Sequence, residues 1–209
     1  LIGFAGALQL SIAAADILLT LTLLAWAALL ATRRARPDVP RFFWALALYG
    51  AATLVASAFS VDPRASFADS KQLVLFLIVP AVYQFARGSR APTVVQVIVT
   101  VGAATAAFGI IQYAMLEYNQ LGQRPRGSMG HYMTYSGLLM LVASAAVARV
   151  LFDRDDRVWP ALVMPALVVA LAMTLSRSAW VGACAAVALL LGLKNLKLLV
   201  ILPALAALF

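Results

Sequence analysis

The residues best suited to chemistry lie in two short segments, of which the longer runs from 124 to 137 with the sequence RPRGSMGHYMTYSG. Arg124 and Arg126 flank a proline here, and His131 and Tyr135 follow four residues apart. That spacing predicts that the two rings face the same side of a helix that begins near residue 130. Arginines held beside an imidazole suit the binding of an anion such as a phosphate. The alternative is an ordinary polar loop whose histidine hydrogen-bonds a carbonyl group.

The second segment runs from 174 to 182 with the sequence TLSRSAWVG, in which Arg177 stands between Ser176 and a second serine. Ser176 is a good N-cap residue for the apolar helix that follows. A cation in the first turn faces the positive end of the helix dipole, at a cost of a few tenths to about 1 kcal/mol, and a bound anion would reverse that sign. Helix amides and a guanidinium together predict a phosphate site. The alternative is an arginine that snorkels to lipid headgroups.

Other polar residues carry weaker signals. Lys71 stands beside an aspartate and a glutamine at the start of an apolar run, where it could meet a phosphate or a lipid headgroup. Asp16 lies inside an apolar run, where structural pairing is the favoured role for a carboxylate. The candidates for a general base are His131, Glu117 and Asp16. Because the sequence has no nucleotide-binding glycine loop and no metal-ligand spacing, we expect no cofactor and no metal.

The composition places these residues in a membrane protein. Hydrophobic residues make up 64% of the 209 residues and charged residues only 11%. These are too few charged residues to cover the surface of a soluble protein. The net charge of +8 does not point to nucleic acid, because the basic residues lie in short loops between apolar runs. The lone Cys184 excludes an internal disulfide.

Apolar runs of spanning length predict an all-α, polytopic transmembrane bundle of about seven to eight spans. The predicted spans are 11–31, 42–59, 71–86, 93–116, 130–151, 158–175 and 178–193, with an eighth starting near 196. Loops on one side carry eleven of the sixteen basic residues, which predicts that this side is cytoplasmic. The outward cations go against that bias and are therefore the candidates for substrate contact: Arg64, Lys71, Arg124, Arg126 and Arg177.

The two polar segments, together with the opening QLSIAAADILLTLTLLAW, resemble the O-antigen ligase family, which is related to the O-antigen polymerases. The resemblance covers essentially all 209 residues as the N-terminal portion of such a protein. It implies an all-helical membrane glycosyltransferase of the GT-C type. We therefore expect 1–209 to be a single transmembrane domain that stops before a large periplasmic loop and further spans.

The resemblance also implies a reaction and its partners. A ligase of this family moves a glycan from undecaprenyl diphosphate to a lipid A-core acceptor, without metal or ATP, at the periplasmic face of the bacterial inner membrane. Arg126 and Arg177 match the family's essential arginines, with Arg124 as a stand-in for Arg126, and they imply catalytic contact with the diphosphate. The resemblance adds His131, Tyr135, Ser176 and Lys71 to Arg124 as expected substrate-binding residues. The family's large-loop histidine has no counterpart in this chain.

Other functions stay open at this point. An O-antigen polymerase would use the same donor, and a transporter of an anionic lipid-linked solute would use the arginines as a binding site. A membrane scaffold would leave the outward arginines unexplained. The glycan transferase predicts that Arg126 and Arg177 converge on one outward-open cavity bordered by the fourth to seventh spans.

Overall fold

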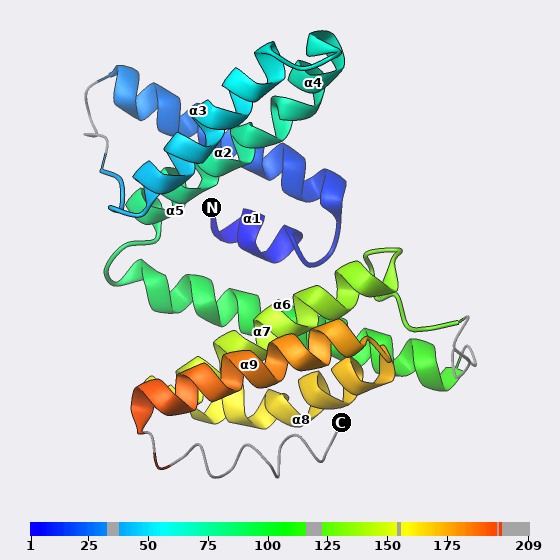
Figure 1. The fold of residues 1–209 in the computed structure, drawn as a ribbon. Helices are drawn as coiled ribbons and strands as arrows, with labels where there is room; N and C mark the ends of the chain where they lie inside the picture. The colour runs from blue at the N-terminus through cyan, green and yellow to red at the C-terminus, as the bar shows by residue number, and fades with distance from the viewer. Residues whose placement is uncertain (33–37, 116–122, 154–155, 196, 198–209) are drawn as a thin grey trace. The chain divides into compact units, whose positions relative to one another are not determined.

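A computed structural model describes residues 1–32, 38–115, 123–153, 156–195 and 197, and every regular element in these ranges is a helix (Figure 1). The prediction of an all-α fold is therefore confirmed for the described residues. In chain order the elements are α1 (Ile2–Ala7), α2 (Ile12–Ala31), α3 (Phe43–Ala58), α4 (Pro63–Asp69), the 3-10 helix η1 (Ser70–Leu77), α5 (Ile78–Phe85), α6 (Arg90–Met115), α7 (Tyr132–Phe152), α8 (Val158–Met173) and α9 (Arg177–Lys194).

Each of the seven predicted spans overlaps helical residues, and the third overlaps both η1 and α5. Among the described residues, five helical segments are long and apolar enough to cross a membrane: Ile12–Ala31, Pro63–Phe85, Arg90–Met115, Tyr132–Phe152 and Arg177–Lys194. The two others, α3 and α8, have 16 residues each and are about 24 Å long, which is shorter than a typical hydrocarbon core. The number of crossings stays a prediction, and the eighth predicted span lies outside the described residues apart from Lys197.

The helical segment at the predicted third span begins earlier than residue 71. The helix starts at Pro63, where Asp62 is the N-cap and its carboxylate accepts a hydrogen bond from the Ala65 amide at 3.2 Å. Proline suits the first helical position because no intrahelical partner exists there for an amide hydrogen. The charged residues at 64 and 69 resembled a loop in the sequence, but they lie on this capped helix. Lys71 consequently lies on η1, where it is exposed.

The described residues form two compact units. The N-terminal unit comprises Leu1–Phe4 and Ala13–Val94, and the C-terminal unit comprises Ala5–Ile12 and Val95–Phe209. In the N-terminal unit, α3 packs against α4 and η1. The Trp26 indole of α2 donates a hydrogen bond of 2.7 Å to the Gln84 amide oxygen of α5. Since both groups lie on apolar helices, this bond satisfies polar atoms that lipid could not.

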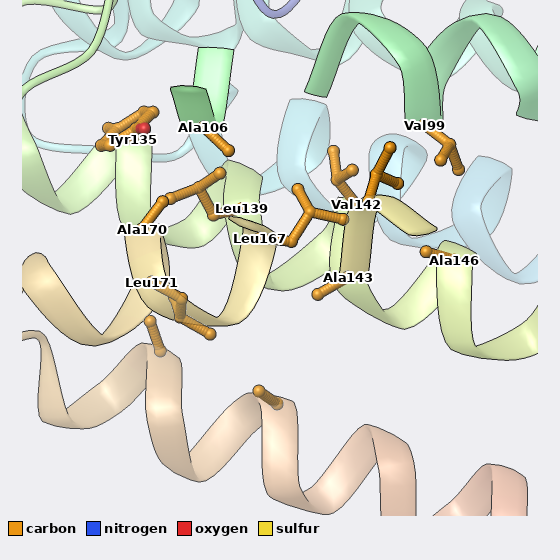
Figure 2. Close-up of a cluster of buried hydrophobic side chains, with 13 residues drawn as sticks. Val99, Ala106, Tyr135, Leu139, Val142, Ala143, Ala146, Leu167, Ala170 and Leu171 are labelled. Carbon is orange, nitrogen blue, oxygen red and sulfur yellow. The ribbon is translucent and has the colours of Figure 1, made fainter. Parts of the chain in front are cut away.

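In the C-terminal unit, α7 is the central helix and packs against both α8 and α9 (Figure 1). Its buried side chains meet those of α6 and α8 in one hydrophobic cluster, in which Leu139, Leu167 and Leu171 are almost fully enclosed (Figure 2). Glycines let the backbones approach closely, as is common between membrane helices. A Cβ atom at Gly102 of α6 would overlap the Val142 side chain of α7.

This contact predicts opposite effects for two glycine substitutions. Gly102→Ala should lower the stability by about 1–2 kcal/mol, because the added methyl group overpacks the contact between α6 and α7. Gly137→Ala is the matched control on α7, where a Cβ atom would have no neighbour within 4 Å. It should raise the stability by up to about 1 kcal/mol through helix propensity. Thermal unfolding in lipid nanodiscs checks both, and a Gly102→Ala protein at least as stable as Gly137→Ala would contradict the packing.

Candidate functional site

The loop that carries Arg124 and Arg126 is fixed to α6 by a pair of hydrogen bonds. The Gly127 amide donates to the side-chain oxygen of Gln112 at 3.0 Å, and the Gln112 side-chain nitrogen donates to the Gly127 carbonyl at 3.2 Å. Gly127 has a φ of +58°, in the left-handed region that favours glycine. The two bonds and this turn define the course of the loop between its arginines and α7.

Tyr135 of α7 packs against the same loop. The side chain is fully buried, and its hydroxyl donates a hydrogen bond of 2.8 Å to the Thr105 carbonyl of α6. Its ring lies against Gly127 and its hydroxyl against Gly109, so that a Cβ atom at either glycine would overlap it. Tyr135 therefore packs the fold and has no surface open to a ligand. The predicted shared face with His131 is wrong, since His131 is exposed and precedes the helix.

A third attachment holds the loop to the short connection between α1 and α2. The Ser128 hydroxyl donates to the Gln9 carbonyl at 2.9 Å. Gln9 is 2% exposed, and its side-chain nitrogen donates to the Ile98 carbonyl of α6 at 2.9 Å. The loop is thus bonded both to α6 and to a segment more than a hundred residues earlier in the chain.

The turn between α8 and α9 brings in the second arginine. Leu175 has a φ of +50°, a left-handed conformation that costs a residue with a side chain roughly 1–2 kcal/mol. The Thr174 hydroxyl donates to the Leu171 carbonyl at 2.7 Å and closes the end of α8. Ser176 occupies the N-cap position of α9 as predicted, but its hydroxyl makes no capping bond and lies 3.4 Å from that of Ser178. Arg177 is the first residue of α9 and is exposed.

These two segments line one cavity of about 580 Å³ in the C-terminal unit. The residues that line it are Arg124, Tyr132, Met133, Leu175, Ser176, Arg177, Ser178 and Trp180. Arg124 is oriented by a hydrogen bond of 3.4 Å to the Leu175 carbonyl and by the Tyr132 ring, whose centroid lies 4.7 Å from the guanidinium carbon. The Trp180 indole donates to the Leu171 carbonyl at 3.1 Å.

The cavity combines groups that bind oxyanions. Two guanidiniums supply fixed positive charge and fork-shaped sets of N–H donors. The start of α9 adds backbone amides that have no partner within the helix, along with the positive end of its dipole. Two serine hydroxyls and two aromatic rings complete the lining. An arrangement with several donors spread over one cavity suits an anion with several oxygens, such as a diphosphate.

The cavity is lined by some of the predicted residues but not by all of them. Arg124, Ser176 and Arg177 share the cavity. Arg126 is exposed and does not line the cavity, so Arg124, and not Arg126, is the partner of Arg177. The expected convergence of Arg126 with Arg177 is not seen in this cavity. Lys71 belongs to the N-terminal unit.

His131 lies beside the cavity without lining it. It is the N-cap residue of α7, and its Nδ1 accepts a hydrogen bond of 3.3 Å from the Met133 amide. Its ring stacks on Tyr132 with centroids 5.0 Å apart and an angle of 23° between the planes. Because Nδ1 is an acceptor, the neutral ring carries its hydrogen on Nε2. In this geometry Nε2 is the atom of His131 that can donate a hydrogen bond.

Of the other candidate bases, Asp16 is exposed on α2 in the N-terminal unit, and Glu117 lies outside the described residues. Among the residues that the structure describes, no three His, Cys, Asp or Glu side chains gather where they could hold a metal ion.

The sequence predicted no binding role for the two aromatic residues of the cavity, Tyr132 and Trp180. The available signal was position, since Trp180 follows Ser176 by about one helical turn and thus shares its side of α9.

No protein-family model, no curated protein and no solved structure matches this chain. The case for its function therefore depends on the residues of the cavity and on the charge pattern of the sequence.

Two glycines of the arginine loop provide a matched test of its support. Gly130 has a φ of +74° with no atom within 4 Å of an added Cβ, so Gly130→Ala should cost only the left-handed strain, about 1–2 kcal/mol. Gly127→Ala should cost roughly 1–3 kcal/mol more, because its methyl group also overlaps Tyr135. Thermal unfolding in nanodiscs measures the difference. Equal losses in the two variants would show that Tyr135 does not support the loop.

Proposed function

We propose that the protein is an O-antigen ligase-like membrane glycosyltransferase, which moves a glycan from undecaprenyl diphosphate to a lipid A-core or similar acceptor. The observation that carries this proposal is the cavity in which Arg124 and Arg177 meet two serines at the start of α9. The donor's diphosphate is an anion of the kind that such a cavity suits. The five apolar segments of spanning length agree with a lipid-borne substrate and with a polytopic, GT-C-like bundle.

The proposed chemistry is a displacement at the first carbon of the transferred glycan. An acceptor hydroxyl oxygen forms a bond to that carbon, while the bond to the diphosphate oxygen breaks and its electron pair stays on the leaving group. Arg124 and Arg177 stabilise the negative charge that grows on the diphosphate, as preorganised hydrogen-bond donors do. The acceptor's proton goes to a base that the described residues of this cavity do not supply.

The position of the cavity favours a transferase over a transporter. Its lining comes from the beginnings of α7 and α9 and from the turns before them. Transporters place their substrate groups near the bilayer midplane, on interrupted helices. A polymerase of the same superfamily would use an identical donor site, and it differs only in its acceptor.

The charge pattern gives the proposed location. With eleven basic residues in the loops of one side, the positive-inside rule orients the cavity toward the periplasmic face of a bacterial inner membrane. Membrane lipids and the two lipid-linked glycans are then the expected partners, and no metal or nucleic acid is required.

The arginines can be tested in cells that lack their own O-antigen ligase. The gene is expressed there, and O-antigen attachment to lipopolysaccharide is measured on gels. Arg177→Ala and Arg124→Ala should each lower attachment by about 10²-fold or more, the usual effect of removing one transition-state donor. Arg126→Ala is the matched control, because Arg126 is exposed outside the cavity.

Undiminished attachment in both cavity variants would refute the proposed role of the cavity. A different outcome would favour the polymerase: neither the wild type nor any variant attaches O-antigen to lipopolysaccharide, and the wild-type gene lengthens the glycan chains on the lipid carrier.

A further inference from the structure

The N-terminal unit contains a second polar cavity, of about 490 Å³, between α3 and the α4–η1 segment. On the α3 side it is lined by Tyr49, Thr53 and Ser57, which follow one another at intervals of four residues and so share one helical face. Asp69, Gln72 and Phe76 are among the residues that line the opposite wall. None of the residues that line this cavity is a lysine or an arginine, in contrast to the arginine-lined cavity of the C-terminal unit.

The polar atoms of this cavity are mainly acceptors. The Thr53 and Ser57 hydroxyls donate to carbonyls of their own helix at 2.9 Å, and the Ser70 hydroxyl donates to the Ser66 carbonyl at 2.8 Å. A hydroxyl that has donated its hydrogen retains acceptor lone pairs. Asp69 adds an exposed carboxylate, which makes no capping bond to η1. Such a wall suits a ligand with several O–H donors and no negative charge.

The cavity also offers aromatic surface. The Tyr49 and Phe76 rings have centroids 6.2 Å apart and are tilted by 48°. Aromatic faces carry partial negative charge and attract weakly positive C–H groups. A pyranose sugar has C–H groups on its faces and hydroxyls around its edge, so it can contact the rings while donating to Asp69. The amine headgroup of a phospholipid is a poorer candidate ligand, because it carries a phosphate and the lining contains no lysine or arginine to bind it.

We propose that this cavity binds one neutral sugar ring. The claim that this sugar is part of the transferred glycan rests on the proposed function. Sugar binding itself depends only on residues of the N-terminal unit. The cavity is then a glycan subsite that is chemically distinct from the diphosphate site. Asp69 accepts hydrogen bonds from sugar hydroxyls, and Tyr49 supplies an apolar face.

The test is saturation-transfer NMR on the full chain in phosphatidylcholine nanodiscs. Maltoside detergents are avoided because their headgroups are themselves sugars. The probes are four neutral glycosides: the methyl glycosides of glucose, galactose, mannose and N-acetylglucosamine. We expect saturation transfer to the ring protons of at least one of them. Asp69→Asn should weaken its binding by about tenfold, the effect of losing a hydrogen bond to a charged group.

Two further variants make the result specific. Tyr49→Leu keeps an apolar side chain of moderate size but removes the ring, and it should also weaken binding several-fold. Arg126→Ala changes an exposed arginine that lines neither cavity and should leave sugar binding unchanged. Absence of transfer to all four glycosides would overturn the proposal, as would unchanged binding in both Asp69→Asn and Tyr49→Leu. Loss of O-antigen attachment in cells does not enter this readout, so the two proposals fail separately.

Discussion

The candidate diphosphate site depends on the burial of one side chain, that of Tyr135. Its hydroxyl donates a hydrogen bond to the Thr105 carbonyl of α6. Its ring occupies the space that a side chain at position 127 would need. Because Tyr135 belongs to α7, this contact connects the arginine loop to the helix that forms the centre of the C-terminal unit. Gln112 and Gln9 then hold the loop from the other sides. The result is a loop whose backbone course is set by buried contacts, so that Arg124 is presented from a fixed backbone.

The second arginine depends on local helix chemistry. The turn into α9 places a leucine in a left-handed conformation and a cation in the first helical turn, and both are unfavourable by themselves. Arg124 donates to the carbonyl of that same leucine, which joins the two segments at the cavity. An anion between the two guanidiniums would offset the repulsion between like charges and the unfavourable dipole together. Strain of this kind is frequent where a protein binds a ligand.

Much of this fold followed from local patterns in the sequence, whereas the composition of the site followed only in part. Helix formation by an apolar run depends on residues close together in the chain, and so does the position of Ser176 and Arg177 at a helix start. The helices accordingly lie where these local patterns predict them. Asp62 and Pro63 carried a helix-start signal that the nearby charges obscured. The choice between Arg124 and Arg126 depends on contacts with Leu175 and Tyr132, and the burial of Tyr135 depends on α6. No spacing rule in a single sequence contains such distant contacts, so the sequence could neither choose between Arg124 and Arg126 nor predict that Tyr135 is buried.

The central claim is that Arg124 and Arg177 together bind a diphosphate. The most direct measurement is a titration of the chain in nanodiscs with inorganic pyrophosphate, followed by the fluorescence of Trp180, with each arginine changed to alanine singly and then jointly. Competing signals from the other tryptophans are removed by changing those residues to phenylalanine. We predict that each single change weakens binding by about tenfold or more and that the double change is clearly non-additive, because both groups contact one ligand. Equal affinity in the wild type and in the double variant would contradict the account.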